Sequence, residues 1–230
     1  MPRVARIVIP GCPRHVTQRG NNRQDVFFVD DDRRAYLDLL TAQARRFGVS
    51  LHAYCLMTNH VHLIATPSGV DSLAKALGRA HFLYTQYINR LHGRYGHLWQ
   101  NRFFSCAMGE EHLWSAFCYV ERNPVRAGLV RRAWLYPWSS AAAHCGKSTA
   151  DGWLDRSLWT AMVGGRDWSQ ALTAAQDDRA MRPLRQYTHS GRPLGSDSFL
   201  SKVECALGRR VRPLPVGRPR AKKAKGGRNR

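Results

Sequence analysis

The sequence is poor in acidic residues and has no long apolar segment. Its 230 residues include 16 Asp and Glu against 36 Lys and Arg, which gives a formal net charge of +20. No run of 18 or more apolar residues occurs, and the first residues lack the hydrophobic segment of a secretory signal. We therefore expect a cytoplasmic protein with no membrane partner, and the charge favours a polyanion such as nucleic acid.

Cysteine pairs and glycine-rich phosphate loops are also missing. The six cysteines are scattered without any Cys-x-x-Cys pair, so we interpret them as reduced small hydrophobes rather than as disulfides or a zinc cage. A hydrophobic content of 43% is ordinary for a globular protein. The length suffices for one substantial core and an appendage.

The periodicity of apolar residues predicts an α+β fold. The expected order is strand, helix, two strands, helix, strand, which suits an antiparallel sheet with helices on one face. A further helix is expected at Glu110 to Arg122, with Pro124 just past its end. The predicted strands are Arg14–Arg19, Val49–Met57, His60–Thr66 and Arg102–Met108, and the predicted helices between them are Asp30–Phe47 and Asp71–His92.

Two histidines stand at the start of the third predicted strand. Alternate side chains of a strand share a face, so His60 and His62 project together while Val61 and Leu63 point into a core. Neutral imidazole is the commonest metal ligand, and two of them on a rigid strand make half of a metal site. The alternative is a surface histidine pair on an edge strand.

A tyrosine and an asparagine lie at the end of the helix after the last strand. Tyr119 and Asn123 are four residues apart and therefore share a helix face. A tyrosine with a pKa of roughly 10 is a poor nucleophile, so it needs a cation beside the phosphate that it attacks. The alternative is a core tyrosine whose hydroxyl is satisfied by a hydrogen bond.

These motifs together resemble a known family. The segments 56–62 (LMTNHVH), 98–103 (LWQNRF) and 119–130 (YVERNPVRAGLV) occur in the order and at the separations found in single-tyrosine transposases of the HUH endonuclease superfamily. The resemblance is strongest to the REP-associated tyrosine transposases of bacteria, and it covers roughly residues 10 to 142.

The resemblance implies a fold, a reaction and a site. The fold would be the ferredoxin-like arrangement. The residues themselves predict a basic and partly helical C-terminal extension, in which Phe199, Leu200, Val203 and Leu207 form a short helical stripe. Tyr119 would attack single-stranded DNA at a REP-like hairpin and form a 5′-phosphotyrosine, while His60, His62 and Asn123 hold Mg²⁺ or Mn²⁺. We expect a bacterial, nucleoid-associated protein whose partners are single-stranded DNA hairpins. Monomer and homodimer remain alternatives.

The last fifty residues carry most of the excess charge. Residues 181–230 contain 14 Lys and Arg against 2 Asp and Glu, a net charge of +12. We predict a catalytic domain at 1–145, a connecting region at 146–180 and a basic DNA-binding tail at 181–230. Arg218 and Arg220 resemble a hook for a narrow minor groove. A solvated charged segment is the alternative.

Further basic and polar residues are candidates for DNA contact. Lys75, Arg79 and Arg90 fall on the exposed face of the second long helix, and the alternative is an ordinary solvated face. Arg102 starts the strand that we expect beside the site, where it would hold phosphate. The first strand ends in a turn whose residues Arg19, Asn21, Asn22 and Arg23 surround a glycine.

Two other functions remain open from the sequence. One is a metal-dependent nuclease in which water attacks and Tyr119 is incidental. The other is a non-catalytic hairpin-binding regulator, whose binding would depend on neither metal nor Tyr119. A covalent protein–DNA adduct separates the transposase reaction from both.

Overall fold

The structure is a computed structural model that describes residues 7–149, 152–174 and 179–213. One four-stranded antiparallel sheet lies at its centre, in the order β2-β3-β1-β4. Each crossover therefore links two strands that are separated by a third, which is the ferredoxin-like arrangement expected from the sequence. The strands are β1 (Arg14–Arg19), β2 (Val49–Met57), β3 (His60–Pro67) and β4 (Phe104–Ala107).

The predicted strands are all present, and the last one differs most from its prediction. We expected it at 102–108, but β4 begins only at Phe104. Residues 101 and 102 form a bend in place of the expected start of the strand, and Asn101 has a φ of 53°, in the left-handed region. The helices of the described residues are α1 (Asp30–Arg46), α2 (Ser72–Leu91), α3 (Leu113–Glu121), α4 (Asn123–Arg126), α5 (Ala141–His144), α6 (Ser157–Val163), α7 (Trp168–Thr173), α8 (Arg182–Ser190) and α9 (Asp197–Leu207), with short 3-10 turns η1 (Asn21–Arg23), η2 (Glu110–His112) and η3 (Ala133–Leu135).

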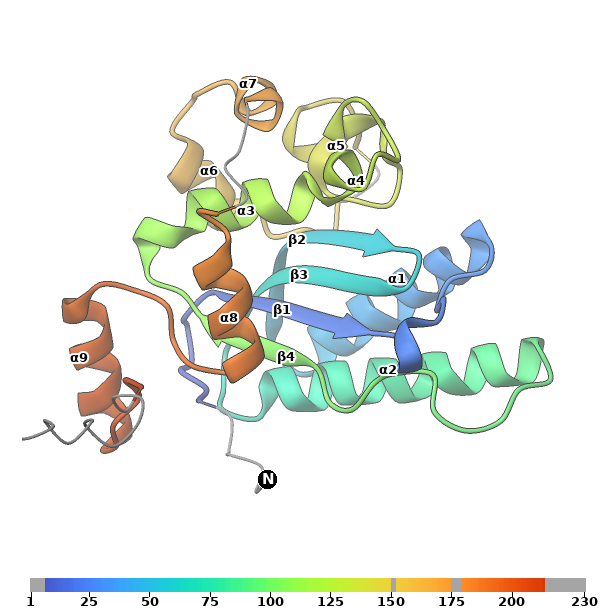
Figure 1. Ribbon diagram of the computed structural model, residues 1–230, viewed down its shortest axis with the longest axis horizontal. Helices are drawn as coiled ribbons and strands as arrows, with labels where there is room; N and C mark the ends of the chain where they lie inside the picture. Colours follow the sequence, from blue (N-terminus) through green and yellow to red (C-terminus); the bar gives the residue numbers. More distant parts are fainter. Residues whose placement is uncertain (1–6, 150–151, 175–178, 214–230) are drawn as a thin grey trace, which may run out of the picture.

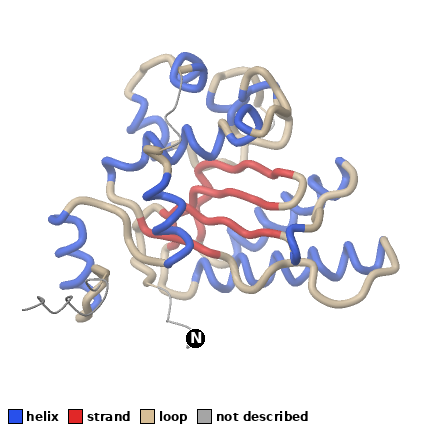
Figure 2. The backbone as a smooth tube through the Cα atoms, viewed as in Figure 1, coloured by secondary structure: helices blue, strands red, loops and turns tan. Residues whose placement is uncertain are grey.

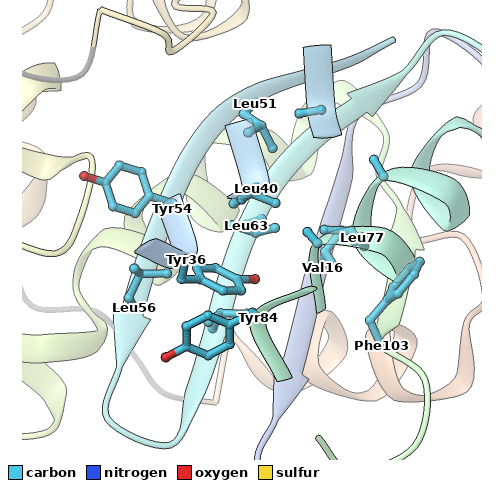
Figure 3. Close-up of a cluster of buried hydrophobic side chains, with 14 of the residues drawn as sticks. Val16, Tyr36, Leu40, Leu51, Tyr54, Leu56, Leu63, Leu77, Tyr84 and Phe103 are labelled. Atoms are coloured by element: carbon cyan, nitrogen blue, oxygen red, sulfur yellow. The ribbon is translucent and has the colours of Figure 1, made fainter. Parts of the chain in front are cut away.

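The crossover helices α1 and α2 cover one face of the sheet (Figure 1). Their apolar stripes bury Tyr36 and Tyr84 against the strands, and Figure 3 shows both rings beside Leu63 of β3. Val61 and Ala65, the neighbours of Leu63 on this face, are also fully buried. The strand alternation thus directs the side chains that alternate with the two histidines into this core, as the sequence predicts.

The opposite face is covered by α3 and the helices that follow it. Figure 2 shows the sheet between these helices and the crossover pair, and in Figure 1 α8 crosses in front of β1 and β4. The second apolar core joins Ile64 and Cys106 of the sheet to Phe117 of α3, Trp168 of α7 and Leu184 of α8. Segments after the last strand therefore cover the sheet face on which the histidines lie.

The helix predicted at 110–122 is divided in the structure. Its first turn is the 3-10 turn η2, and α3 ends at Glu121. Pro124 does follow the end of α3, as expected, but it also stands in the first turn of α4. Proline suits that position because its φ is already helical and the first N–H groups of a helix need no partner within it.

The C-terminal part is partly helical, as predicted. The expected apolar stripe at 199–207 belongs to α9, whose buried Val203 packs with Ile7 and Val211 in a small separate cluster. The division of the chain at residues 145 and 180 stays a prediction. Within the described residues, no helix has the combination of length and apolar composition that a membrane crossing requires.

Candidate active site

The two histidines of the His60-Val61-His62 motif lie side by side on one face of β3. Their ring centroids are 5.0 Å apart and the rings are nearly perpendicular, at 83°. In the register of the sheet His62 is opposite Thr17 of β1, and His60 is opposite Arg19. Opposed residues of paired strands project from the same face, so these four side chains converge on the side of α3.

Tyr119 of α3 meets this histidine pair. Its ring centroid is 5.4 Å from that of His62, at an interplanar angle of 87°. The ring is 6% exposed, and it lines the same cavity of about 270 Å³ as His60 and His62. The structure therefore brings the predicted nucleophile and two predicted metal ligands together. The other residues around the cavity are His15, Thr17, Arg19, Gln100, Phe104, Arg126, Arg185, Thr188 and His189.

Burial keeps both imidazoles uncharged near neutral pH. It lowers the pKa of His60 to about 4, with smaller contributions from the charges of Arg19 and Arg126. It also holds the pKa of His62 well below the ordinary value, and the neighbouring His60 and His15 add to that effect. Neutral imidazole is the form that coordinates a metal, so both rings are in the required state.

Asn59 fixes the position of the proton on His60. Its Nδ2 donates to the carbonyl oxygen of Arg23 at 3.0 Å, and this bond orients the carboxamide. Its Oδ1 lies 2.6 Å from His60 Nδ1. Because a carboxamide oxygen only accepts, His60 Nδ1 is the donor and Nε2 keeps its lone pair. This role of Asn59 was not predicted from the sequence, although the residue is adjacent to the motif.

Two arginines lie against the ring of Tyr119. The guanidinium carbon of Arg126 is 4.8 Å from the ring centroid, and that of Arg185 is 5.5 Å away. Positive charge at this position stabilises negative charge that develops on a phenolic oxygen or on a phosphate beside it. Arg126 comes from α4, within the motif quoted above, whereas Arg185 comes from α8. Neither was singled out from the sequence.

Asn123 is buried at the end of α3 and does not line the cavity. Its Nδ2 donates to the carbonyl oxygens of Tyr119 at 2.9 Å and of Val120 at 3.3 Å. Pro124 has no N–H, so the carbonyl of Val120 lacks the donor four residues on, and the Asn123 amide supplies one. Its Oδ1 accepts from Arg126 at 2.5 Å. The Arg126 hydrogen bond occupies one of the two acceptor positions of this oxygen, so a metal ion would share the oxygen with Arg126 or replace it.

His15 of β1 is a further histidine of the cavity. Its ring is nearly parallel to that of His62, with centroids 5.2 Å apart, and it meets the ring of Tyr119 edge-on at 5.7 Å. Its two nitrogens lie within hydrogen-bond distance of His62 and of Thr188 on α8. Burial lowers the pKa of His15 to about 3, so this ring is also neutral. The signal available in the sequence was strand alternation, which places His15 on the same face of the predicted strand as the candidate Arg19.

The donor set fits a divalent metal in part. His60 offers a lone pair at Nε2, and His62 is neutral and faces the same cavity. Within the part of the chain that the structure describes, no three His, Cys, Asp or Glu side chains converge on one point. A third protein ligand would thus have to be an amide, a hydroxyl or a carbonyl oxygen, as the prediction for Asn123 requires.

Some of the predicted DNA-contacting residues lie around this cavity. Arg19 lines it and is exposed. Asn21, Asn22 and Arg23 form the turn η1, in which Asn22 and Arg23 have positive φ angles of 51° and 61°. Arg102 is exposed and shares a second hollow of about 420 Å³ with Asn21. Polar groups therefore continue from the cavity toward the loop before β4.

The other predicted contacts lie elsewhere. Lys75, Arg79 and Arg90 are exposed on α2, which packs on the opposite face of the sheet from the cavity. Lys75 also lies 3.4 Å from the carboxylate of Asp71, and Arg79 covers the ring of Phe82 at 5.3 Å. Arg218 and Arg220 lie outside the described residues.

A basic groove of about 460 Å³ adjoins the cavity. The two hollows share Phe104, Thr188 and His189, so they adjoin along these three side chains. The ring of Phe104 meets that of His189 at 4.9 Å, where the two hollows join. The arginines around the groove are Arg102, Arg192, Arg209 and Arg210.

The sequence was compared with known families and proteins. Residues 9–123, half of the chain, match the model of a transposase family. The chain belongs to that family, the IS200-like transposases. The match ends at Asn123, so Arg126, Arg185 and Thr188 lie beyond it. No curated protein matches the sequence.

A solved structure of a REP-associated tyrosine transposase shows the same fold. A REP-associated tyrosine transposase bound to a REP hairpin superposes with a TM-score of 0.56 at 20% sequence identity, over 76% of this chain and 96% of that one. A transposase-like protein from Deinococcus radiodurans R1 gives a TM-score of 0.38 at 24% identity, over 53% of this chain and 97% of that one. The first similarity supports the ferredoxin-like arrangement with the elements that follow it.

Proposed function

We propose that this transposase cleaves and rejoins single-stranded DNA at a palindromic hairpin, with Tyr119 as the nucleophile. One observation carries the proposal: Tyr119 lies in the same cavity as His60 and His62, with Arg126 against its ring. A hairpin is the proposed substrate because the structurally similar REP-associated transposase was solved with a REP hairpin.

The proposed reaction exchanges one phosphoester bond for another. The phenolic oxygen of Tyr119 loses its proton and bonds to the scissile phosphorus, and the bond from phosphorus to the 3′ oxygen breaks. The departing oxygen takes up a proton, which leaves a free 3′-hydroxyl and a 5′-phosphotyrosine. Attack of a second 3′-hydroxyl reverses these steps and joins the strands. The phosphoester energy is retained throughout, so no nucleotide hydrolysis is needed.

A divalent ion, Mg²⁺ or Mn²⁺, would be held by Nε2 of His60 and of His62 and, by our proposal, by Asn123. When bound, it would polarise the scissile phosphate. Arg126 would supply positive charge beside the ring of Tyr119, and the N–H groups that Asn123 does not use would bind a phosphate in the cavity.

The substrate strand is proposed to run from the cavity into the adjoining basic groove. Phosphate contacts in the groove would give affinity without sequence information. Arg19, Arg23 and Arg102, with Asn21 and Asn22, are proposed to bind the strand on the side of η1. For DNA outside the cavity, the proposed contacts remain Lys75, Arg79, Arg90, Arg218 and Arg220.

The decisive experiment is covalent trapping. The purified protein is incubated with a labelled single-stranded hairpin and Mn²⁺, and denaturing gels are examined for cleavage and for a protein–DNA adduct. Tyr119→Phe removes only the phenolic oxygen, so we expect it to abolish both products while hairpin binding stays nearly intact. Tyr95→Phe is the control, because Tyr95 is 97% exposed and lies outside the cavity.

The outcomes separate the alternative functions. Cleavage without an adduct, retained by Tyr119→Phe, would show a nuclease that uses water. Hairpin binding without cleavage, unaffected by metal, would show a regulator. His60→Ala and His62→Ala should each remove the metal-dependent activity, whereas Asn123→Ala should weaken metal binding less. Normal cleavage by the double histidine variant would place the chemistry elsewhere.

A further inference from the structure

A continuous chain of buried hydrogen bonds connects α8 with the metal-ligand candidate His62. His62 Nδ1 lies 3.0 Å from Nε2 of His15, and His15 Nδ1 lies 2.8 Å from the hydroxyl oxygen of Thr188. The Thr188 hydroxyl donates to the carbonyl oxygen of Leu184, one helical turn earlier, at 2.6 Å. The Cys106 sulfur is also 3.2 Å from this hydroxyl. The side chains of His15, His62 and Thr188 are at most 5% exposed.

The direction of each bond follows from the Thr188 hydroxyl. A hydroxyl has one proton and two acceptor positions, and Thr188 donates its proton to the carbonyl oxygen of Leu184. It must therefore accept from its other two neighbours. Cys106 can donate, because burial raises the pKa of its thiol to about 11 and the sulfur keeps its proton. The second donor is then Nδ1 of His15.

The proton positions on His15 and His62 follow from that of the Thr188 hydroxyl. His15 is a neutral ring whose single proton is on Nδ1, so its Nε2 can only accept. The donor to that nitrogen is Nδ1 of His62, which therefore carries the proton of the second ring. The lone pair of His62 is left on Nε2. Asn59 produces the same arrangement on His60, through a carboxamide oxygen.

We propose that His15 and Thr188 are positioning residues, which hold His62 with its proton on Nδ1 and its metal-binding lone pair on Nε2. The inference rests on the proposed function, in which His62 is a metal ligand. Partners of this kind orient a ligand and raise its basicity, and their loss typically weakens metal binding about 10- to 100-fold.

The geometry also holds the rings in place. The rings of His15 and His62 are nearly parallel, at an interplanar angle of 16°, and Tyr119 lies edge-on to both. Thr188 belongs to α8, which lies outside residues 9–123, the span that matches the family model. A helix of the C-terminal part thus helps to position His62 in the site.

The first test is the position of the proton, measured on the metal-free protein by ¹⁵N–¹H correlation spectra of the histidine rings. Wild-type His62 and His15 should both show the Nδ1–H form. Thr188→Val is nearly isosteric but accepts no hydrogen bond, so His15 and His62 should shift toward the Nε2–H form or a mixture of the two. Thr188→Ser keeps the hydroxyl and should keep the wild-type pattern.

The second test is Mn²⁺ binding without DNA, followed by calorimetry and by electron paramagnetic resonance. Thr188→Val should weaken binding about 10- to 100-fold, and Thr188→Ser should restore it to within about threefold of wild type. Urea unfolding of each variant identifies a loss of binding that merely reflects a loss of fold. Rescue by serine separates a role of the hydroxyl from a role of side-chain volume.

Either of two results would overturn the inference. One is a wild-type spectrum with the proton of His62 on Nε2, and the other is Thr188→Val with unchanged ring spectra and unchanged Mn²⁺ affinity. The proposed function fails separately: if hairpin DNA forms no adduct with Tyr119 while the ring spectra behave as expected, the positioning role stands without the transposition chemistry. The spectra decide the inference even where Mn²⁺ binding is weak.

Discussion

Glutamine in place of Glu121 is expected to loosen the layer of short helices that packs on α3. The carboxylate of Glu121 is fully buried and accepts three hydrogen bonds, from residues that belong to different segments. Ser140 Oγ and His144 Nδ1 each lie 2.5 Å from one oxygen, and Trp168 Nε1 lies 2.8 Å from the other. Glu121 therefore connects α3, two residues after Tyr119, to α5 and α7.

The loss in the free energy of unfolding follows from the number of donors that bind the Glu121 carboxylate. A hydrogen bond to a charged acceptor contributes about 1.5–3 kcal/mol. The glutamine amide has one acceptor oxygen, so it must turn its NH₂ toward at least one donor, and we expect a loss of about 2–3 kcal/mol. Glu121→Ala leaves all three donors unpaired and should cost about 3–5 kcal/mol. For a chain of this size, Glu121→Gln should lower the melting temperature by roughly 4–12 °C.

Urea unfolding and thermal melting measure the effect. Glu110→Gln is the matched control, because Glu110 is exposed in η2, and its stability should change by less than about 0.5 kcal/mol. Trp168→Phe removes one donor, so its cost and that of Glu121→Gln should not add in the double variant. A Glu121→Gln protein that melts with the wild type would refute the assigned role of this carboxylate.

Three further changes have specific expected results. Burial lowers the pKa of His81 to about 3 from 6.5, so the free energy of unfolding should fall as the pH drops through this window. His81→Gln keeps a partner for the Tyr36 hydroxyl and should remove up to about 1.4 kcal/mol per pH unit of that fall. Urea unfolding at pH 6 and pH 5 measures the difference. Arg126→Ala should slow single-turnover adduct formation by Tyr119 about 10²- to 10³-fold, and an unchanged rate would remove Arg126 from the mechanism. Deleting residues 214–230 removes seven Lys and Arg and no acid, so the logarithmic salt slope of DNA binding should fall by about 0.7 for each phosphate that these residues neutralise, while the cut position stays the same.

The sheet was predictable from the sequence because its signals are local. β1 and β2 have the bounds predicted for them: the turn residues that follow β1 marked its end, and alternating apolar residues indicated β2. The glycine after α1 marked the end of that helix. The start of β4 was not predictable, because no apolar pattern indicates the bend at residues 101 and 102. The 3-10 turn η2 before α3 was not predicted either, because turn geometry rather than periodicity determines it. The end of α3 was predicted, because Pro124 marks it in the sequence.

Asn123 shows how a correct spacing can leave a role undecided. Its distance of four residues from Tyr119 predicts a shared helix face, and the side chain does fold back to the carbonyl oxygen of Tyr119. The absent N–H of Pro124 was visible in the sequence, but the consequence for Asn123 was not. The amide nitrogen is used to cap α3, and the remaining oxygen is bound by Arg126.

The cavity itself was only half predictable, for a physical reason. His60, His62 and Tyr119 carry their chemistry in short motifs, whereas Arg185 and Thr188 acquire theirs only because α8 packs against β1 and β4. These two residues are three apart and so share a helix face, but the same spacing occurs on any amphipathic helix. What distinguishes Thr188 is its hydrogen bond to His15 on a strand 173 positions earlier in the chain. What distinguishes Arg185 is its contact with the ring of Tyr119 on α3. Local periodicity cannot specify that packing, because it records which face of α8 is buried and not which strand buries it.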